Sequence, residues 1–273
     1  MKLKIRISTC PNDTFMFEAM LHGRIDTEGL EFETEPADIE RLNEGLLQGD
    51  EADISKMSYA VLPDIRRRYR VLPSGSALGR GNGPLLVSAK ALSKKEMTGL
   101  CVAVPGKYTT ASLLLRKFFP GIGCTRECLF SDVADAVLKG ETEAGVLIHE
   151  GRFTYEEKGL NLVADLGREW ETSCGLPLPL GGIVVSRRLP EDVQRKAGRV
   201  LRRSIEYALE HPSVSYDFVK RYAQEMDDDV IDRHIGLFVN HYSLDLGEEG
   251  RQAVQTLLSE RMKADAFADV FVG

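Results

Sequence analysis

The chain has 273 residues, of which 43% are hydrophobic and 28% charged, and its formal net charge is −7. This balance is typical of a globular protein with a buried core, and it excludes long disordered or low-complexity regions. An acidic chain without a basic face does not favour nucleic-acid binding. No segment approaches the roughly 18 consecutive apolar residues that a membrane-spanning helix needs. We therefore expect neither nucleic acid nor a membrane as a partner.

The N-terminus and the cysteines indicate the compartment. The segment MKLKIRIS lacks the apolar core of a signal peptide and alternates like a strand, so we predict a cytoplasmic protein. The five cysteines are irregularly spaced and odd in number, which does not suggest a disulfide framework. We expect reduced thiols. A zinc site is not expected either, because Cys124 and Cys128 lack a second pair of ligands.

The first third of the chain alternates short strands with short helices. Asn12, Asp13 and Thr14 offer N-caps for a helix that runs from about Phe15 to His22 and stops at Gly23. A second helix begins at Asp38 and ends near Gly49, and a third covers 59–65. The predicted strands are 4–8, 30–35, 52–54, 69–72 and 84–88.

The middle of the chain repeats this pattern, and the end is almost wholly helical. Thr109 and Thr110 cap the apolar segment ASLLLRKFF, and Ser131 and Asp132 begin a helix that runs to Gly140. From Pro190 to about Met262 the pattern is helical. The predicted strands are 100–104, 127–130, 144–148 and 181–186. Alternating strands and helices predict an α/β fold with parallel sheets covered by helices on both faces.

Small polar residues follow four of these strands. They are the segments 8–14, 55–58, 105–110 and 149–152. Ligands of open α/β sheets bind at the carboxyl ends of the strands, so we expect these segments to line one site.

The order of the elements predicts two lobes. Residues 1–90 and 187–273 form a large discontinuous lobe, and residues 91–186 form a small one. Two crossings between the lobes would make a two-strand hinge, and the helical tail would return to the large lobe. This is the architecture of periplasmic binding proteins, which close a cleft around a ligand.

His149 ends the apolar run GVLIH and is the candidate catalytic base. A neutral imidazole can take up a proton near neutral pH, and the end of a buried strand places it at the expected cleft. The alternative is a hydrogen-bonded structural histidine. Glu150 is a doubtful partner, because adjacent strand residues point to opposite faces.

Two helix starts and one strand end can bind an anion. Thr109 and Thr110 present hydroxyls and free N–H groups, although plain N-capping would explain one of the two. The segments Cys10–Thr14 and Ser55–Ser58 offer similar groups. Lys56 could pair with an anion or be solvated. Cys10 has no neighbour in the sequence that would activate it as a nucleophile, so we place it in the cleft wall.

The glycine-rich segment GRGNG at 79–83 does not fit a dinucleotide-binding motif, because a strand follows it. A flexible hinge or a tight approach to the ligand explains it better. His211 and His234 lie in the helical tail, where we expect them to be structural or exposed.

Seven segments together resemble the family of 1,4-dihydroxy-6-naphthoate synthases, which act in the futalosine route to menaquinone. The resemblance covers nearly the whole chain, and it is the combination of segments that is specific. The segments are STCPNDTF (8–15), KMSYA (56–60), SGSALGRGNGPL (74–85), VPGKYTTA (104–111), IHEGRFTY (148–155), GLPLPLGGI (175–183) and FVNHYSLDLGEEG (238–250).

The resemblance implies a two-lobed fold of the type II periplasmic-binding-protein class. It implies a carbon–carbon lyase that converts cyclic dehypoxanthine futalosine to 1,4-dihydroxy-6-naphthoate without a metal or organic cofactor. The family's base falls on His149. Its ligand contacts fall on Lys56, Met57 and Ser58 and on Thr110 and Ala111.

The partner is then a small carboxylate-bearing molecule. The residues predicted to contact it are Asn12, Asp13, Thr14, Lys56, Met57, Ser58, Arg80, Thr109, Thr110, Ala111 and Arg152. Lys56, Arg80, Arg152 and backbone N–H groups are all candidates for its carboxylate. The sequence does not indicate whether the protein is a monomer or a homodimer.

Two other functions remain open from the sequence. Chorismate dehydratase, an enzyme of the same route, resembles this family in fold, but the segments CPNDTF and IHEGRFTY favour the naphthoate synthase. A non-catalytic protein that binds a small anion would share the fold, although the lack of a signal peptide and the position of His149 speak against it.

Overall fold

The structure is a computed structural model that describes residues 1–49, 51–223 and 227–273. It contains two compact units. Unit 1 comprises Met1–Gly79 and Pro179–Gly273, and unit 2 comprises Arg80–Leu178. Both boundaries lie earlier in the chain than predicted. β6 (Leu85–Ser88) pairs with a strand of unit 2, whereas β11 (Leu178–Ser186) pairs with strands of unit 1.

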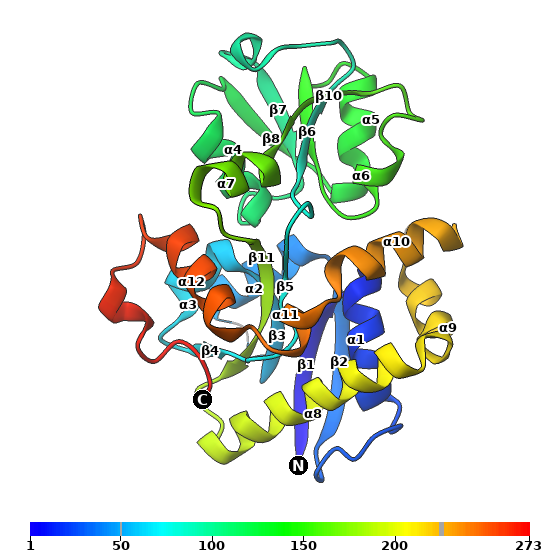
Figure 1. Cartoon of the computed structure of the whole chain (residues 1–273), viewed down its shortest axis with the longest axis vertical. Coiled ribbons are helices and arrows are strands. Elements are labelled where there is room, and N and C mark those ends of the chain that lie inside the picture. Colours follow the sequence, from blue (N-terminus) through cyan, green and yellow to red (C-terminus); the bar gives the residue numbers. More distant parts are fainter. Residues whose placement is uncertain (50, 224–226) are drawn as a thin grey trace. The chain divides into compact units, whose positions relative to one another are not determined.

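Unit 1 is built on a six-stranded sheet in the order β2-β1-β3-β11-β4, with β5 paired to β11 (Figure 1). β1 is parallel to β2 and to β3, whereas β11 is antiparallel to β3 and β4. The strands are β1 (Lys2–Ser8), β2 (Glu31–Ala37), β3 (Ile54–Ser58), β4 (Tyr69–Val71), β5 (Ala77–Gly79) and β11.

Helices from both ends of the chain pack together in unit 1. In Figure 1 the yellow α8 and α9 lie beside the blue α1. Apolar residues of α8 recur every three or four positions and join the core with β1. The helices are α1 (Pro11–Leu21), α2 (Ile39–Gln48), α3 (Leu62–Ile65), α8 (Glu191–Glu210), α9 (Pro212–Tyr222), α10 (Asp228–Phe238), α11 (His241–Leu244) and α12 (Gly247–Leu258). Residues 179–273, which include the helical tail, belong to unit 1.

Unit 2 has a second sheet in the order β10-β6-β9-β7-β8. Its strands are β6, β7 (Cys101–Val104), β8 (Cys124–Glu127), β9 (Ala144–Leu147) and β10 (Asn161–Asp165). Its helices are α4 (Thr110–Phe118), α5 (Val133–Leu138), α6 (Gly151–Thr154) and α7 (Leu166–Cys174). A smaller apolar cluster packs α5 against this sheet.

Both sheets are mixed, whereas the sequence predicted parallel sheets. β7 is parallel to β8 and β9, but β6 runs antiparallel to β9 and β10. β6 and β11 lie at or just after the points where the chain passes from one unit to the other. Neither strand is therefore joined to its neighbour in the sheet by a helical crossover. Nothing then forces them to run parallel.

Two predicted boundaries are also wrong. α1 begins at Pro11, so Asn12, Asp13 and Thr14 lie in its first turn instead of capping it. Proline suits the first position of a helix because it needs no hydrogen bond from its nitrogen. β8 ends at Glu127, and Phe130 lies in a short 3-10 turn, Phe130–Asp132, where the sequence predicts the end of a strand.

The glycine-rich segment makes a close backbone approach. A Cβ atom on Gly83 would lie 2.2 Å from the α-carbon of Gly167, at the start of α7. Only glycine fits at such a contact. The chain also passes from unit 1 to unit 2 at Gly79 and Arg80, within the same segment.

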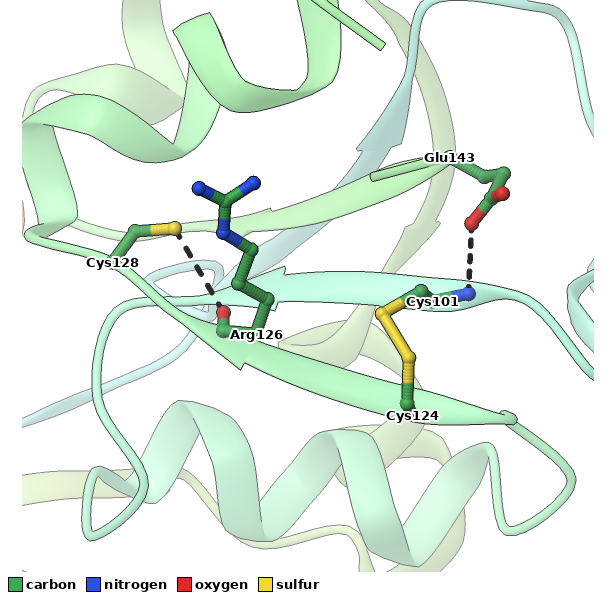
Figure 2. Close-up of a disulfide and its surroundings, with 5 residues drawn as sticks. All are labelled: Cys101, Cys124, Arg126, Cys128 and Glu143. Carbon is green, nitrogen blue, oxygen red and sulfur yellow. Dashed lines mark hydrogen bonds between the residues drawn. A yellow bond between two sulfur atoms is a disulfide. The ribbon is translucent and has the colours of Figure 1, made fainter. Parts of the chain in front are cut away.

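The expectation of five reduced thiols is wrong for two of them. Cys101 and Cys124 form a disulfide bond between β7 and β8 (Figure 2). The two residues are direct register partners, and their α-carbons are 4.5 Å apart. The N–H of Cys101 also donates to Glu143. Cys10, Cys128 and Cys174 are free.

In the described part of the chain, no helix combines the length and the hydropathy that crossing a membrane requires.

The disulfide should stabilise unit 2. It closes a loop across 23 residues of sequence, and the chain-entropy account gives such a crosslink about 3 kcal/mol. Replacement of both Cys101 and Cys124 by serine should therefore lower the free energy of unfolding by about that amount, measured by chemical denaturation without reductant. Cys128→Ser, which removes a neighbouring free thiol, is the matched control. Equal stability of the double variant and the wild type would contradict this expectation.

Candidate functional site

The carboxyl ends of β1 and β3 share one edge of the unit 1 sheet, because the two strands are parallel neighbours. α1 starts immediately after β1, with Cys10 as its N-cap and no side-chain capping bond. Thr14 turns its hydroxyl back to the carbonyls of Cys10 and Pro11. This predicted ligand contact thus has intrahelical partners.

Asp13 and Lys56 form a buried ion pair at this edge. The Lys56 Nζ atom lies 2.5 Å from Oδ1 of Asp13. Asp13 is fully buried and Lys56 is 5% exposed. Two charges out of water are stable only when each compensates the other. The helix start and the strand are therefore tied together by charge as well as by packing.

Asn12 extends this pair to α10. Its amide Nδ2 donates to Asp13 Oδ1 at 2.9 Å, which leaves its Oδ1 as an acceptor. Nε2 of His234 lies 3.0 Å from that oxygen, so this nitrogen carries the proton. All four side chains are buried. We call Asn12, Asp13, Lys56 and His234 the unit 1 group.

His234 is the member of the unit 1 group that the sequence did not indicate. It lies 222 residues from Asn12 along the chain. His234 lies on an amphipathic helix, and no motif in the surrounding sequence marks it as a site residue. The nearest signal is that α10 places His234 and Ile231, both buried, one turn apart.

Burial raises the pKa of the Asp13 carboxyl, and the Lys56 ammonium opposes that shift. Oδ2 of Asp13 is buried and has no hydrogen-bond partner in the described residues. The ionised form of Asp13 therefore depends on Lys56.

The segment Lys56–Ser58 lies within β3, whereas we expected it to follow the end of a strand. β11 pairs along it, with Gly181 opposite Ser58 and Gly182 opposite Met57. Its side chains alternate: Lys56 reaches Asp13, Ser58 bonds to Asn43, and Met57 is buried in the core. The strand ladder uses backbone groups that we expected to bind an anion.

In unit 2 the loop between β7 and α4 is closed by its own hydroxyls. Thr109 and Ser112 both donate to the carbonyl of Gly106, and the Ser112 N–H donates to Thr109 Oγ1. Thr109 is thus the predicted N-cap of α4. Thr110 and Ala111 are the first two helical residues, and both are buried. The first N–H groups of a helix have no intrahelical acceptor and face the loop.

His149 lies two residues beyond β9, at the same edge of the sheet as this loop, because β7 and β9 are parallel. Its φ of 53° is in the left-handed region, which is uncommon for residues other than glycine. The edge of its ring meets Phe130, with centroids 4.9 Å apart and planes at 77°. Phe130 follows β8, the third parallel strand at this edge. A strained backbone and an aromatic contact therefore fix the imidazole.

Two predicted arginines also belong to unit 2. Arg80 is exposed and donates to the carbonyl of Gly175 at 2.9 Å. Arg152, in α6, is half-buried, and burial lowers the pKa of its guanidinium while Asp165 opposes the shift. We call Thr109, Thr110, Ala111, His149 and Arg152 the unit 2 group.

Among the described residues, no set of three or more histidine, cysteine, aspartate or glutamate side chains is arranged to hold a metal ion.

Comparison with known proteins identifies the family. A family model described as menaquinone biosynthesis matches residues 3–262. The chain belongs to the menaquinone biosynthesis family. A curated member of this family from Thermus thermophilus, named 1,4-dihydroxy-6-naphtoate synthase, is 45% identical over 94% of this chain and 93% of its own length. A protein of the same name from Streptomyces coelicolor is 41% identical over 94% of this chain and 92% of its own.

Solved structures give the fold. A crystal structure from Archaeoglobus fulgidus matches with a TM-score of 0.89 at 35% identity and covers 97% of each chain. A Candida albicans protein, described as having the generic periplasmic binding protein structural fold, matches with a TM-score of 0.70 at 15% identity, over 100% of this chain and 98% of its own. The predicted fold class is confirmed: this member of the menaquinone biosynthesis family has the periplasmic-binding-protein fold.

The ion pair of the unit 1 group generates a stability prediction. Lys56→Met leaves the Asp13 carboxylate buried without its cation, which should lower the free energy of unfolding by about 3–5 kcal/mol near neutral pH. Because the pKa of Asp13 is raised in the folded state, this loss is absent below about pH 4 and grows as the pH rises. Urea unfolding at several pH values measures it.

The double variant Asp13→Asn, Lys56→Met is the control. It removes both charges, so it should be more stable at neutral pH than Lys56→Met alone. If the double variant is no more stable than Lys56→Met, charge compensation between Asp13 and Lys56 does not stabilise the fold.

Proposed function

We propose that this protein is a 1,4-dihydroxy-6-naphthoate synthase, a carbon–carbon lyase. Its substrate is cyclic dehypoxanthine futalosine, and its products are 1,4-dihydroxy-6-naphthoate and a sugar-derived fragment. The identity of 45% over 94% of the chain to a relative of that name carries this proposal. The chemistry of the unit 2 group supports it.

His149 acts as the general base in this proposal. The ring system of the substrate must aromatise as the bond to the sugar-derived part breaks, and this requires that a proton be removed. A neutral imidazole suits the task at physiological pH. The left-handed backbone and the contact with Phe130 support the role, because a base must be held in one orientation before the substrate arrives.

The start of α4 stabilises the charge that develops on the substrate oxygens. The N–H groups of Thr110 and Ala111 lie at the positive end of the helix, where anions bind. Thr109 contributes indirectly, since its cap fixes the loop. Such fixed dipoles stabilise a transition state without rearranging.

We further propose substrate contacts within each unit, taken separately. Lys56, Ser58 and the start of α1 are the candidates from unit 1. Three other residues are weaker candidates. Met57 is buried in the core, the Thr14 hydroxyl bonds within its own helix, and Arg80 is exposed to solvent.

A cytoplasmic location belongs to the proposal as well, because the relatives are named as biosynthetic enzymes. The Cys101–Cys124 disulfide counts against a strongly reducing compartment. In a reducing cytoplasm the two thiols would be reduced, and β8 would be held by its backbone bonds to β7.

The function is tested by incubating the purified protein separately with cyclic dehypoxanthine futalosine and with chorismate. We expect the first to be consumed, with 1,4-dihydroxy-6-naphthoate detected by mass spectrometry, and chorismate to be unchanged. Loss of chorismate by elimination of water would instead identify a chorismate dehydratase. Turnover of neither substrate would refute the proposed reaction.

His149→Asn should lower kcat by about 10²–10⁴-fold, because the general base is lost. Asparagine tolerates the left-handed backbone, so the fold and the affinity for the product should change little. Steady-state kinetics and calorimetry with the product separate the two effects. His211→Asn changes an exposed histidine and is the matched control. A kcat of the His149 variant within a few-fold of the wild type would remove His149 from the mechanism.

A further inference from the structure

The three basic side chains predicted to bind the substrate carboxylate have different surroundings. Lys56 already pairs with Asp13. Arg80 is exposed and donates to a backbone carbonyl. In the described part of the chain, Arg152 has no carboxylate within 4 Å, and its buried Nη1 atom has no hydrogen-bond partner. Arg152 is therefore the cation whose hydrogen-bonding capacity is least used.

The residues around Arg152 contact its side chain but do not neutralise its positive charge. The guanidinium lies 5.8 Å from the ring centroid of Phe153, a weak cation–π contact. The nearest acidic neighbour by electrostatic effect is Asp165, whose Oδ1 caps α7 by accepting from Gly167 and Arg168. The phenol of Tyr155 adds a smaller effect. Asp165 thus lies near enough to influence the charge but does not form an ion pair with it.

A half-buried guanidinium in this state is costly. Buried polar groups in folded proteins nearly always have partners, because an unpaired donor loses its water and gains nothing in return. A negatively charged ligand would replace the hydrogen bonds to water that the guanidinium loses on burial. A carboxylate matches the planar fork of a guanidinium with two parallel hydrogen bonds.

We propose that Arg152 binds the carboxylate of the substrate and selects carboxylates over neutral analogues. The inference rests on the proposed function, whose product is by name a naphthoate. It assigns one residue to a role that the sequence left open among three.

Arg152 is also suitably placed to orient the substrate. It follows His149 by three residues, so their α-carbons are at most about 11 Å apart. Glu150, between them, is buried and is the N-cap of α6. A carboxylate held by Arg152 would therefore be anchored to the same short segment that holds the base. The rigid substrate would then fix the distance from its carboxylate to its reacting carbon. Binding at the carboxylate would in this way orient the reacting carbon toward the base.

Equilibrium binding of two probes tests the proposal without relying on turnover. The probes are 2-naphthoate and 2-naphthamide, which have the same rings and differ in charge. Calorimetry with the wild type should show that the acid binds about 10- to 100-fold more tightly than the amide. In Arg152→Met the two affinities should become nearly equal. Arg152→Lys, which keeps the charge but loses the fork, should give an intermediate ratio.

Arg168→Met is the matched control, since it removes one exposed arginine from unit 2 and should keep the wild-type ratio. Because the readout is a ratio within one protein, partial unfolding of a variant lowers both bindings and leaves the ratio unchanged. Arg152→Met with the wild-type preference for the acid, or a wild type with no preference, overturns the proposal. If cyclic dehypoxanthine futalosine is not consumed but the preference for the acid still depends on Arg152, only the proposed reaction is refuted.

Discussion

Neighbouring parallel strands must place their carboxyl ends at the same edge of a sheet, and both groups of candidate residues depend on this constraint. In unit 1 the constraint brings the start of α1 beside the end of β3. In unit 2 it gathers the ends of β7, β8 and β9, and with them Thr109, Phe130 and His149. The antiparallel strands β6 and β11 complete the sheets without contributing such loops.

The two edges differ in how their charges are compensated. The unit 1 group is neutralised from within, because Lys56 meets Asp13 and Asn12 links that carboxylate to His234. The unit 2 group contains a cation, Arg152, with no ion-pair partner among the described residues. An internally paired group suits a rigid frame, and an uncompensated one suits a ligand. This contrast, more than the number of polar residues, distinguishes the edge that we propose for catalysis.

Much of this was predictable because it rests on local sequence. The cap at Thr109 follows from two threonines before an apolar helix, and the strand before His149 follows from a short apolar run. The glycine segment indicated that a side chain would not fit there, but the contact of Gly83 is with the backbone of Gly167, which the sequence did not predict. The assignment of the family required several segments together, since no single one was specific.

The remainder depends on contacts between distant parts of the chain. The partnership of His234 with Asn12 spans 222 residues, and the Cys101–Cys124 bond requires that β7 and β8 pair in one particular register. β3 extends through Ser58 because β11, more than 120 residues later, supplies its backbone partners. Periodicity within a window carries no information on such pairings, so the prediction that Lys56–Ser58 follow the end of a strand was wrong.

A crystal structure with 1,4-dihydroxy-6-naphthoate bound tests the central claim most directly. The account predicts that the carboxylate of the product meets the guanidinium of Arg152 and that a hydroxyl oxygen of the product lies within hydrogen-bond reach of His149. A product bound with its carboxylate on another cation and its ring remote from His149 would contradict it.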